Sequence, residues 1–173
     1  AVRGATDRFW AAIRDALGKG PPQLSRGMNV WKAWEHPDLL LSQTCGLPYR
    51  GRLQGRVTLI GTPDYGLPGC APGEYNSVFL ARAHDPRTAL GAFNGESCAV
   101  NGSTSQGGWA GPILHARSKG VSFGKNVKTG AHAASAQAVA SGDADIAGID
   151  ALSWRFIQQE RGFSADLKVI DVT

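Results

Sequence analysis

Residues 133–172, AASAQAVASGDADIAGIDALSWRFIQQERGFSADLKVIDV, decide the expected fold, because helical and extended patterns alternate within them. An alanine-rich helix ends at Gly142, and a second helix ends at Gly162, each followed by an apolar strand. The expected elements are a helix over 133–141, a strand over 145–149, a helix over 151–161 and a strand over 166–172. This alternation predicts an α/β fold with mainly parallel sheets flanked by helices.

The same two patterns recur upstream of this stretch. They predict helices at 5–17, 28–35 and 109–118, strands at 39–44, 56–61, 77–83 and 97–101, and an extended segment at 121–123. Pro112 falls inside the helix expected over 109–118, so that helix must be short, kinked, or start later than its first residue. We expect two lobes, residues 1–86 and 87–173, with their boundary near 84–87.

The composition is that of a globular protein, with 42% apolar and 18% charged residues among 173. No stretch approaches the roughly 18 consecutive apolar residues of a membrane span, and the first ten residues contain no apolar signal-peptide core. The first 60 residues hold nine of the 18 Lys and Arg but four of the 14 Asp and Glu. Because these basic residues are scattered, they favour an anionic partner only slightly and predict no nucleic-acid surface.

The three cysteines, Cys45, Cys70 and Cys98, show no Cys-x-x-Cys spacing. The sequence therefore predicts no zinc or redox site and no cofactor. Cys98 lies in a short apolar run and is expected to pack as a small hydrophobe. Cys45 and Cys70 each lie beside glycine in turn-like sequence, and a disulfide between them and two separate thiols both remain open.

The strongest local signal is the segment Asn101-Gly102-Ser103-Thr104-Ser105-Gln106-Gly107, which places three hydroxyls between a strand and a helix. The start of a helix exposes unpaired N–H groups and the positive end of the helix dipole. Hydroxyl and N–H donors at such a place suit a phosphate-like anion. The same residues also fit an ordinary N-cap in a glycine-rich loop, and that alternative stays open.

Two further positions precede expected helices. His132 ends the segment Thr129-Gly130-Ala131-His132, where it can donate to an anion at the cost of a lowered pKa, or serve as a surface cap. Asp150 follows a strand at its carboxyl end, where ligands of α/β proteins usually bind. It can accept from a hydroxyl or ammonium group of a ligand, or cap the helix that begins at Ala151.

Four segments together resemble the phosphate-, phosphite- and phosphonate-binding components of ABC importers. They are LSQTCG at 41–46, GEYNS at 73–77, NGSTS at 101–105 and SAQAVASGDADIA at 135–147. The resemblance implies a type II periplasmic-binding-protein fold, in which two α/β lobes clamp a ligand in a cleft. Compared with that family, the chain is expected to lack the strand before the first helix and the C-terminal return.

The resemblance also implies roles for particular residues. Ser103, Thr104 and Ser105 would hold the oxygens of the anion, His132 would approach from a neighbouring loop, Tyr75 and Tyr65 would face it from the first lobe, and Asp150 would meet the rest of the ligand. Taken alone, both tyrosines also fit packed loop aromatics. The resemblance further favours a Cys45–Cys70 disulfide, a periplasmic or extracellular location, and an ABC permease as partner, with no catalytic residue and no metal.

Two other functions remain as alternatives. The segment Gln43-Thr44-Cys45-Gly46 suits a cysteine-nucleophile enzyme, because its amide and N–H groups can form an oxyanion site beside Cys45. Its base would be His36, His84, His115 or His132, and no spacing singles one out. The second alternative is a sensor domain that binds an oxyanion without transport.

Overall fold

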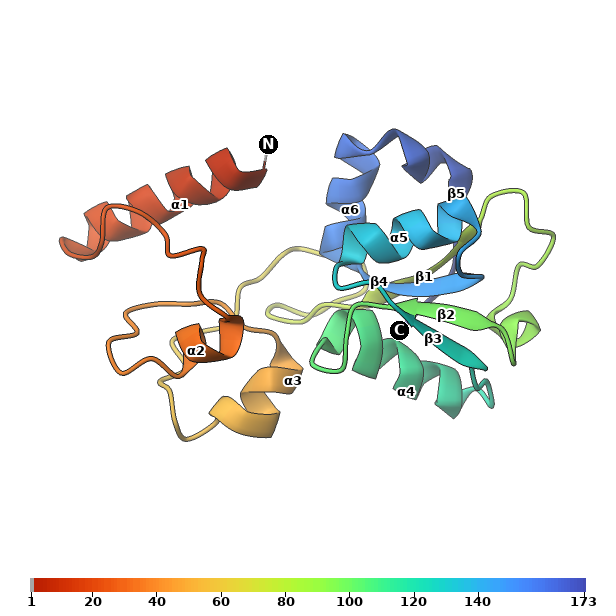
Figure 1. Ribbon diagram of the computed structural model, residues 1–173, viewed down its shortest axis with the longest axis horizontal. Coiled ribbons are helices and arrows are strands. Elements are labelled where there is room, and N and C mark those ends of the chain that lie inside the picture. Colours follow the sequence, from red (N-terminus) through yellow and green to blue (C-terminus); the bar gives the residue numbers. More distant parts are fainter. Residues whose placement is uncertain (1) are drawn as a thin grey trace. The chain divides into compact units, whose positions relative to one another are not determined.

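The computed structural model describes residues 2–173, which form two compact units (Figure 1). The first unit extends to Thr44 and includes Leu53–Val57, and the second comprises Cys45–Arg52 and Thr58–Thr173. This division differs from the expected boundary between residues 86 and 87. The reason is that residues 77–82 hydrogen-bond to strands near the C-terminal end of the chain and so belong to the second unit.

A single five-stranded sheet organises the second unit. Its strands are β1 (Ser77–Arg82), β2 (Ser97–Val100), β3 (Lys125–Lys128), β4 (Ile146–Asp150) and β5 (Leu167–Val172), in the order β3-β2-β4-β1-β5. Strand β2 is parallel to β3 and β4, whereas β1 is antiparallel to both of its neighbours, β4 and β5. Four strands therefore run in one direction and β1 runs in the other, so the expected mainly parallel sheet contains one reversed strand.

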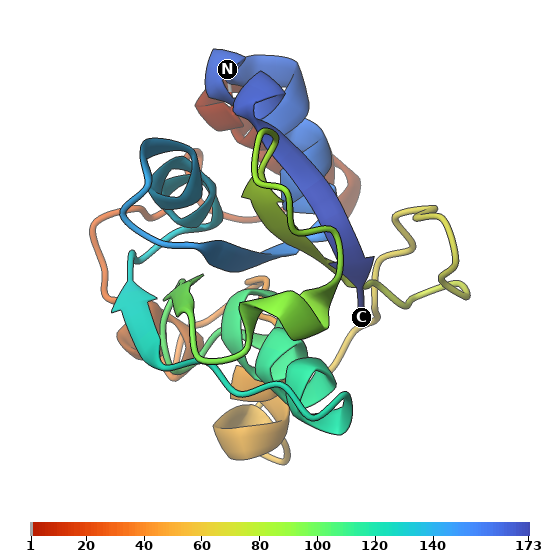
Figure 2. The same ribbon diagram turned by 90° about the vertical axis from the view of Figure 1, so that its right-hand side faces the viewer.

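Helices cover both faces of this sheet, as Figures 1 and 2 show. Helices α5 (His132–Ser141) and α6 (Ala151–Glu160) lie on one face, and α4 (Gly111–Ser118) lies on the other. Alternate residues of β1 point to opposite faces of the sheet, and each face has its own hydrophobic core. Val78 and Leu80 pack with α5 and α6, while Phe79 and Ala81 pack on the side of α4. The period of two in a strand thus fills both layers of a three-layer α/β unit.

The start of α4 shows how closely helix and sheet approach. Pro112 lies in the first helical turn, so the helix starts later than residue 109, as one of the three alternatives predicted. A π-helical turn, η3 (Gln106–Ala110), precedes it without a break. A Cβ on Gly148 of β4 would lie 2.4 Å from Pro112 Cβ and Cγ. Only glycine therefore allows α4 to pack this close to the sheet.

The first unit is built from helices α1 (Val2–Leu17) and α2 (Val30–Trp34). Trp10 is its buried anchor, and the indole Nε1–H of Trp10 donates to the Pro21 carbonyl at 3.0 Å. The apolar stripe expected along α1 is otherwise open, because Phe9 is 69% exposed and Leu17 is 48% exposed. In α2, the rings of Trp31 and Trp34 meet edge to face at 5.0 Å.

Two apolar runs that the sequence predicts as strands, 39–44 and 56–61, form no sheet. Leu59 and Ile60 are 57% and 76% exposed, and Val57 makes only an isolated bridge with Gln54. All strands of residues 2–173 belong to the one sheet, so neither run has a neighbouring strand to pair with. An unpaired strand is not stable in water.

Smaller predictions also meet corrections. The segment predicted to be extended at 121–123 joins no strand, and the strand β3, which the sequence did not predict, begins at Lys125. Its sequence, Lys-Asn-Val-Lys, is that of a polar edge strand, which apolar patterning does not reveal. No disulfide joins Cys45 to Cys70, since all three cysteines of the described chain are thiols. Cys98 is buried, as expected, and burial raises its pKa to about 12.

Candidate functional site

The topology brings four chain segments to one edge of the sheet. Because β2, β3 and β4 are parallel, their carboxyl ends meet there, and the reversed strand β1 begins at the same edge. The pairing of Ser77 with Asp150 fixes this arrangement. The helices that follow β2, β3 and β4 therefore all begin at this edge, with the positive ends of their dipoles toward it.

The three hydroxyl residues at 103–105 form a turn directly after β2, which we call the hydroxyl turn. Ser103 and Thr104 are exposed at the tip of a turn that is closed by a bond from Ser105 N–H to the Gly102 carbonyl, at 3.0 Å. Ser105 Oγ accepts from Gly108 N–H at 3.0 Å and so caps the helical segment. The N-cap alternative is thus correct for Ser105. Its hydroxyl hydrogen is not used by that bond and can still be donated.

His132 and Asp150 lie side by side at the starts of α5 and α6. The backbone N–H of Asp150 donates to His132 Nδ1 at 3.3 Å, which leaves the hydrogen of a neutral imidazole on Nε2. Burial lowers the pKa of His132, although the Asp150 carboxylate opposes this effect. Asp150 Oδ1 accepts from Ser153 N–H at 2.7 Å, so the helix-cap alternative holds for Asp150, with Oδ2 left for another donor.

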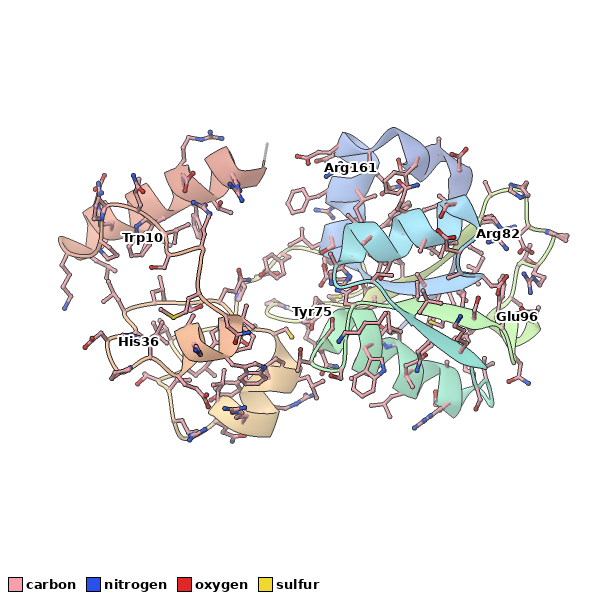
Figure 3. All side chains as sticks on the ribbon, viewed as in Figure 1. Trp10, His36, Tyr75, Arg82, Glu96 and Arg161 are labelled. Atoms are coloured by element: carbon pink, nitrogen blue, oxygen red, sulfur yellow. The ribbon has the colours of Figure 1, made fainter. Side chains whose placement is uncertain are left out.

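Tyr75 stands just before β1, at the end of the sheet away from Arg82 and Glu96 (Figure 3). A Cβ on Gly107 would lie 3.2 Å from Tyr75 Cε2 and 3.1 Å from Asp150 Cβ, so both side chains flank the start of the helical segment after β2. Burial raises the pKa of Tyr75, and the nearby Cys45 and Asp150 raise it further. The phenol therefore keeps its proton at neutral pH and can donate.

Tyr65 is half-buried and close enough to Tyr75 to influence its titration. Both tyrosines belong to the second compact unit, whereas the sequence assigned them to a separate first lobe. The structure thus brings Tyr75, His132, Asp150 and the 103–105 turn to one sheet edge, and places Tyr65 beside Tyr75.

The sequence did not predict the cationic side chain of Arg50 at this edge. A hollow of about 340 Å³ is lined by Arg50, Tyr75, Ser77, Gln106 and several glycines. Arg50 donates from Nη2 to Gln106 Oε1 at 2.9 Å, and its charge lies near the Tyr75 phenol. Arg50 stands in the segment Tyr-Arg-Gly-Arg, which has no motif that would single it out. Cys45 reaches the same region, with Sγ 3.7 Å from the Thr104 carbonyl oxygen.

Two histidines named as candidate bases for Cys45 have other contacts. His115 Nε2 lies 3.0 Å from Asp171 Oδ2, and His132 Nδ1 accepts from the Asp150 backbone. These contacts tie His115 to β5 and His132 to the start of α6.

The family described as the periplasmic phosphonate substrate-binding protein of ABC transporters matches residues 44–173. The chain belongs to this family. The match covers the hydroxyl turn, the whole sheet and every residue named above at its edge. No curated protein sequence matches the chain.

Solved structures with the same fold include the following three proteins. PhnD1 of Prochlorococcus marinus, in complex with methylphosphonate, has a TM-score of 0.54 and 20% identity over 58% of this chain and 41% of its own. A binding protein component of the Pseudomonas aeruginosa ABC phosphonate transporter has a TM-score of 0.52 and 20% identity, over 65% and 38%. A Xanthomonas citri protein bound to chloride ion has a TM-score of 0.53 and 18% identity, over 58% and 42%.

At these identities the likeness establishes the fold alone, which is that of the type II periplasmic binding proteins. The chain spans about two fifths of the length of these structures. None of the helices formed by residues 2–173 is long and apolar enough to cross a lipid bilayer.

Proposed function

We propose that this chain captures a phosphonate or related phosphorus oxyanion at the sheet edge and delivers it to an ABC permease from the periplasm. The family supports this class of ligand. The observation that carries the proposal is the convergence, at one edge, of the hydroxyl turn, the Tyr75 phenol and the His132 imidazole. All are neutral donors, and they lie where three helices begin.

In this proposal each side chain has a separate task. Ser103, Thr104 and Ser105 donate their hydroxyl hydrogens to the phosphorus-bound oxygens. His132 donates from Nε2, and Tyr75 donates from its phenol. Hydrogen bonds to a charged group contribute about 1.5–3 kcal/mol each, so four or five suffice for a micromolar complex after the cost of association.

Asp150 sets which organic group the site accepts. Its Oδ1 is occupied by Ser153 N–H, and the remaining Oδ2 is an acceptor next to Tyr75 and His132. A carboxylate here repels a second anionic group and favours an amine or hydroxyl on the ligand. We therefore propose that 2-aminoethylphosphonate binds more tightly than methylphosphonate, and that Asp150→Asn reduces this preference.

Calorimetric titration with phosphate, phosphite, methylphosphonate and 2-aminoethylphosphonate tests the proposal. The wild-type chain is expected to bind at least one of them, and the triple variant S103A/T104A/S105A is expected to bind none. Ser118→Ala is the matched control, because Ser118 Oγ donates to the His115 carbonyl at the far end of α4. A folded wild-type sample that binds none of the four anions refutes the proposal.

A further inference from the structure

A chain of buried hydrogen bonds connects the loops that follow β2 and β3. Ser135 of α5 is completely buried, and its Oγ lies 2.6 Å from Thr129 Oγ1. The same Ser135 hydroxyl donates to Asn101 Oδ1 at 3.2 Å. When Ser135 gives its one hydroxyl hydrogen to Asn101, the hydrogen between the two hydroxyls comes from Thr129. Thr129 Oγ1 also lies 3.2 Å from the Val100 carbonyl oxygen and 3.3 Å from the Ala131 carbonyl oxygen, which are alternative acceptors for that hydrogen. In the first arrangement the chain runs from Thr129 through Ser135 to Asn101.

The bond from Ser135 is made to the oxygen of the Asn101 amide. Oδ1 is the acceptor, so Nδ2 with its two hydrogens is on the other side of the side chain. Among residues 2–173, no acceptor takes a hydrogen bond from Nδ2. Asn101 is half-buried, and no buried side-chain nitrogen of the described residues lacks a partner, so Nδ2 is open to solvent.

The backbone holds this amide beside the hydroxyl turn. Asn101 N–H donates to the Gly108 carbonyl, and Gly130 N–H donates to the Asn101 carbonyl, at 3.2 and 3.0 Å. The amide also lies against the Gly108 backbone, where a Cβ would come within 2.5 Å of Asn101 Cγ. Asn101 thus contacts the residue that Ser105 caps and the loop that leads to His132.

We propose that Asn101 Nδ2 donates to the bound oxyanion, and that Ser135 and Thr129 are positioning residues that hold the amide in the donating orientation. This inference rests on the proposed function. A fixed amide with two unused hydrogens, one residue before the turn at 102–105, adds a donor that is neutral and already ordered. Ordering before binding increases affinity, because the ligand does not have to immobilise the side chain.

Asn101→Asp is the decisive variant, because it keeps the shape of the side chain and an oxygen that accepts from Ser135. It replaces only the NH₂ group, with a negatively charged oxygen. Losing a hydrogen bond to a charged group costs about 10- to 100-fold in affinity, and the added repulsion should bring the loss for methylphosphonate above about 100-fold. Ser135→Ala leaves Nδ2 but frees the amide to turn, and should weaken binding about 3- to 10-fold.

Matched controls separate this effect from a general change of charge or fold. Asn126→Asp makes the same substitution on the exposed edge strand β3 and should leave the affinity for methylphosphonate within about twofold. Thr129→Ser keeps the hydroxyl of the chain and should bind like wild type, whereas Thr129→Val removes it and should bind like Ser135→Ala.

Calorimetric titration with methylphosphonate, together with ¹H–¹⁵N spectra of the wild-type side-chain amides, tests the proposal. The NH₂ proton resonances of Asn101 should shift downfield on saturation, because an N–H that donates to an anionic oxygen is deshielded. The inference is overturned if Asn101→Asp binds within twofold of wild type, or if these resonances do not move. If Asn101→Asp does not fold, the wild-type spectra decide. If wild type binds none of the four anions, the proposed function fails as well.

Discussion

Ser103 and Ser105 lie two residues apart in the hydroxyl turn, but the structure gives them different energetic roles. Ser105 Oγ caps the helical segment through Gly108 N–H, whereas Ser103 is exposed and its hydroxyl makes no hydrogen bond with the described residues. Removing an N-cap hydroxyl costs about 1 kcal/mol of folding free energy. In a protein of this size that lowers the melting temperature by about 3 °C. Ser103→Ala should leave stability within about 0.5 kcal/mol of wild type.

Both substitutions should weaken ligand binding. Each removes one hydrogen bond to an anionic oxygen, worth about 1.5–3 kcal/mol, which corresponds to a loss of roughly 10- to 100-fold in affinity. Differential scanning calorimetry measures the first effect and titration with methylphosphonate measures the second. Ser103→Ala should therefore change affinity alone, and Ser105→Ala should change both quantities.

Three outcomes would contradict this assignment. If Ser103→Ala lowers the melting temperature as much as Ser105→Ala, the exposed turn is not as the structure describes it. If Ser105→Ala lowers stability and leaves affinity unchanged, Ser105 is a cap only. If neither variant affects affinity, the hydroxyl turn does not bind the anion.

Three further predictions concern side chains whose pKa values differ from their ordinary values. Burial lowers the pKa of His132 below its ordinary value of 6.5, so the unfolded chain takes up the proton first. The free energy of unfolding should therefore fall as the pH drops below about 6.5. Denaturant titrations should show a smaller fall for His132→Gln. An equal fall in the variant would exclude His132 as the source of this pH dependence. Hydrogen bonds from Arg87 hold the pKa of Asp85 well below its usual range, against the effect of burial. This stabilisation is present at neutral pH and is lost as the pH falls below about 4. Asp85→Asn should lower the free energy of unfolding, measured in urea at pH 7, by about 2–4 kcal/mol. It should leave the affinity for methylphosphonate unchanged, because Asp85 follows β1 at the opposite end of the sheet. A change in affinity would contradict this placement. Cys98, with its pKa raised to about 12, should react with a thiol reagent only after unfolding, whereas Cys45 and Cys70 should react in the native protein. A native protein with no fast thiol would instead indicate a Cys45–Cys70 bridge.

The C-terminal half of the fold could be predicted because its signals are local. Gly142 ends α5 with a φ of 87°, and Asp150 caps α6 with its own carboxylate. Each signal acts within one or two turns of the chain, so it can be interpreted without knowing the neighbouring strands. The predicted helices and strands from residue 133 onward agree with the observed ones to within one residue at most ends.

The two apolar runs at 39–44 and 56–61 show the limit of this kind of inference. Apolar composition indicates that a segment tends to be buried. Pairing with another strand decides whether that segment becomes part of a sheet. The sheet of the second unit places β1 between β4 and β5, so residues 77–82 are enclosed on both sides. The order of strands, which depends on long-range contacts, is not contained in the periodicity of any one segment.

The same limit explains which residues of the proposed site could be predicted from the sequence. Ser103, Ser105, His132 and Asp150 were predicted because each lies next to the start of a helix, and that position can be interpreted from the sequence. Arg50 and Asn101 were not predicted. Arg50 lies 56 residues before Gln106, to which it donates. The proposed role of Asn101 depends on the buried hydroxyl of Ser135, which lies in a helix 34 residues later.

The N-cap and anion-binding interpretations of the hydroxyl turn are therefore complementary. A serine that caps a helix uses a lone pair of its oxygen to accept from Gly108 N–H, and the capping bond fixes where that oxygen lies. The hydroxyl hydrogen is then held near one position and can be donated without further ordering. A cap that is also a donor loses less entropy on binding than a freely rotating serine. Asp150 combines the two tasks in the same way, with one oxygen on Ser153 N–H and the other open. In the proposed function, the local signals that end and begin helices in this sequence thus also preorganise the anion site.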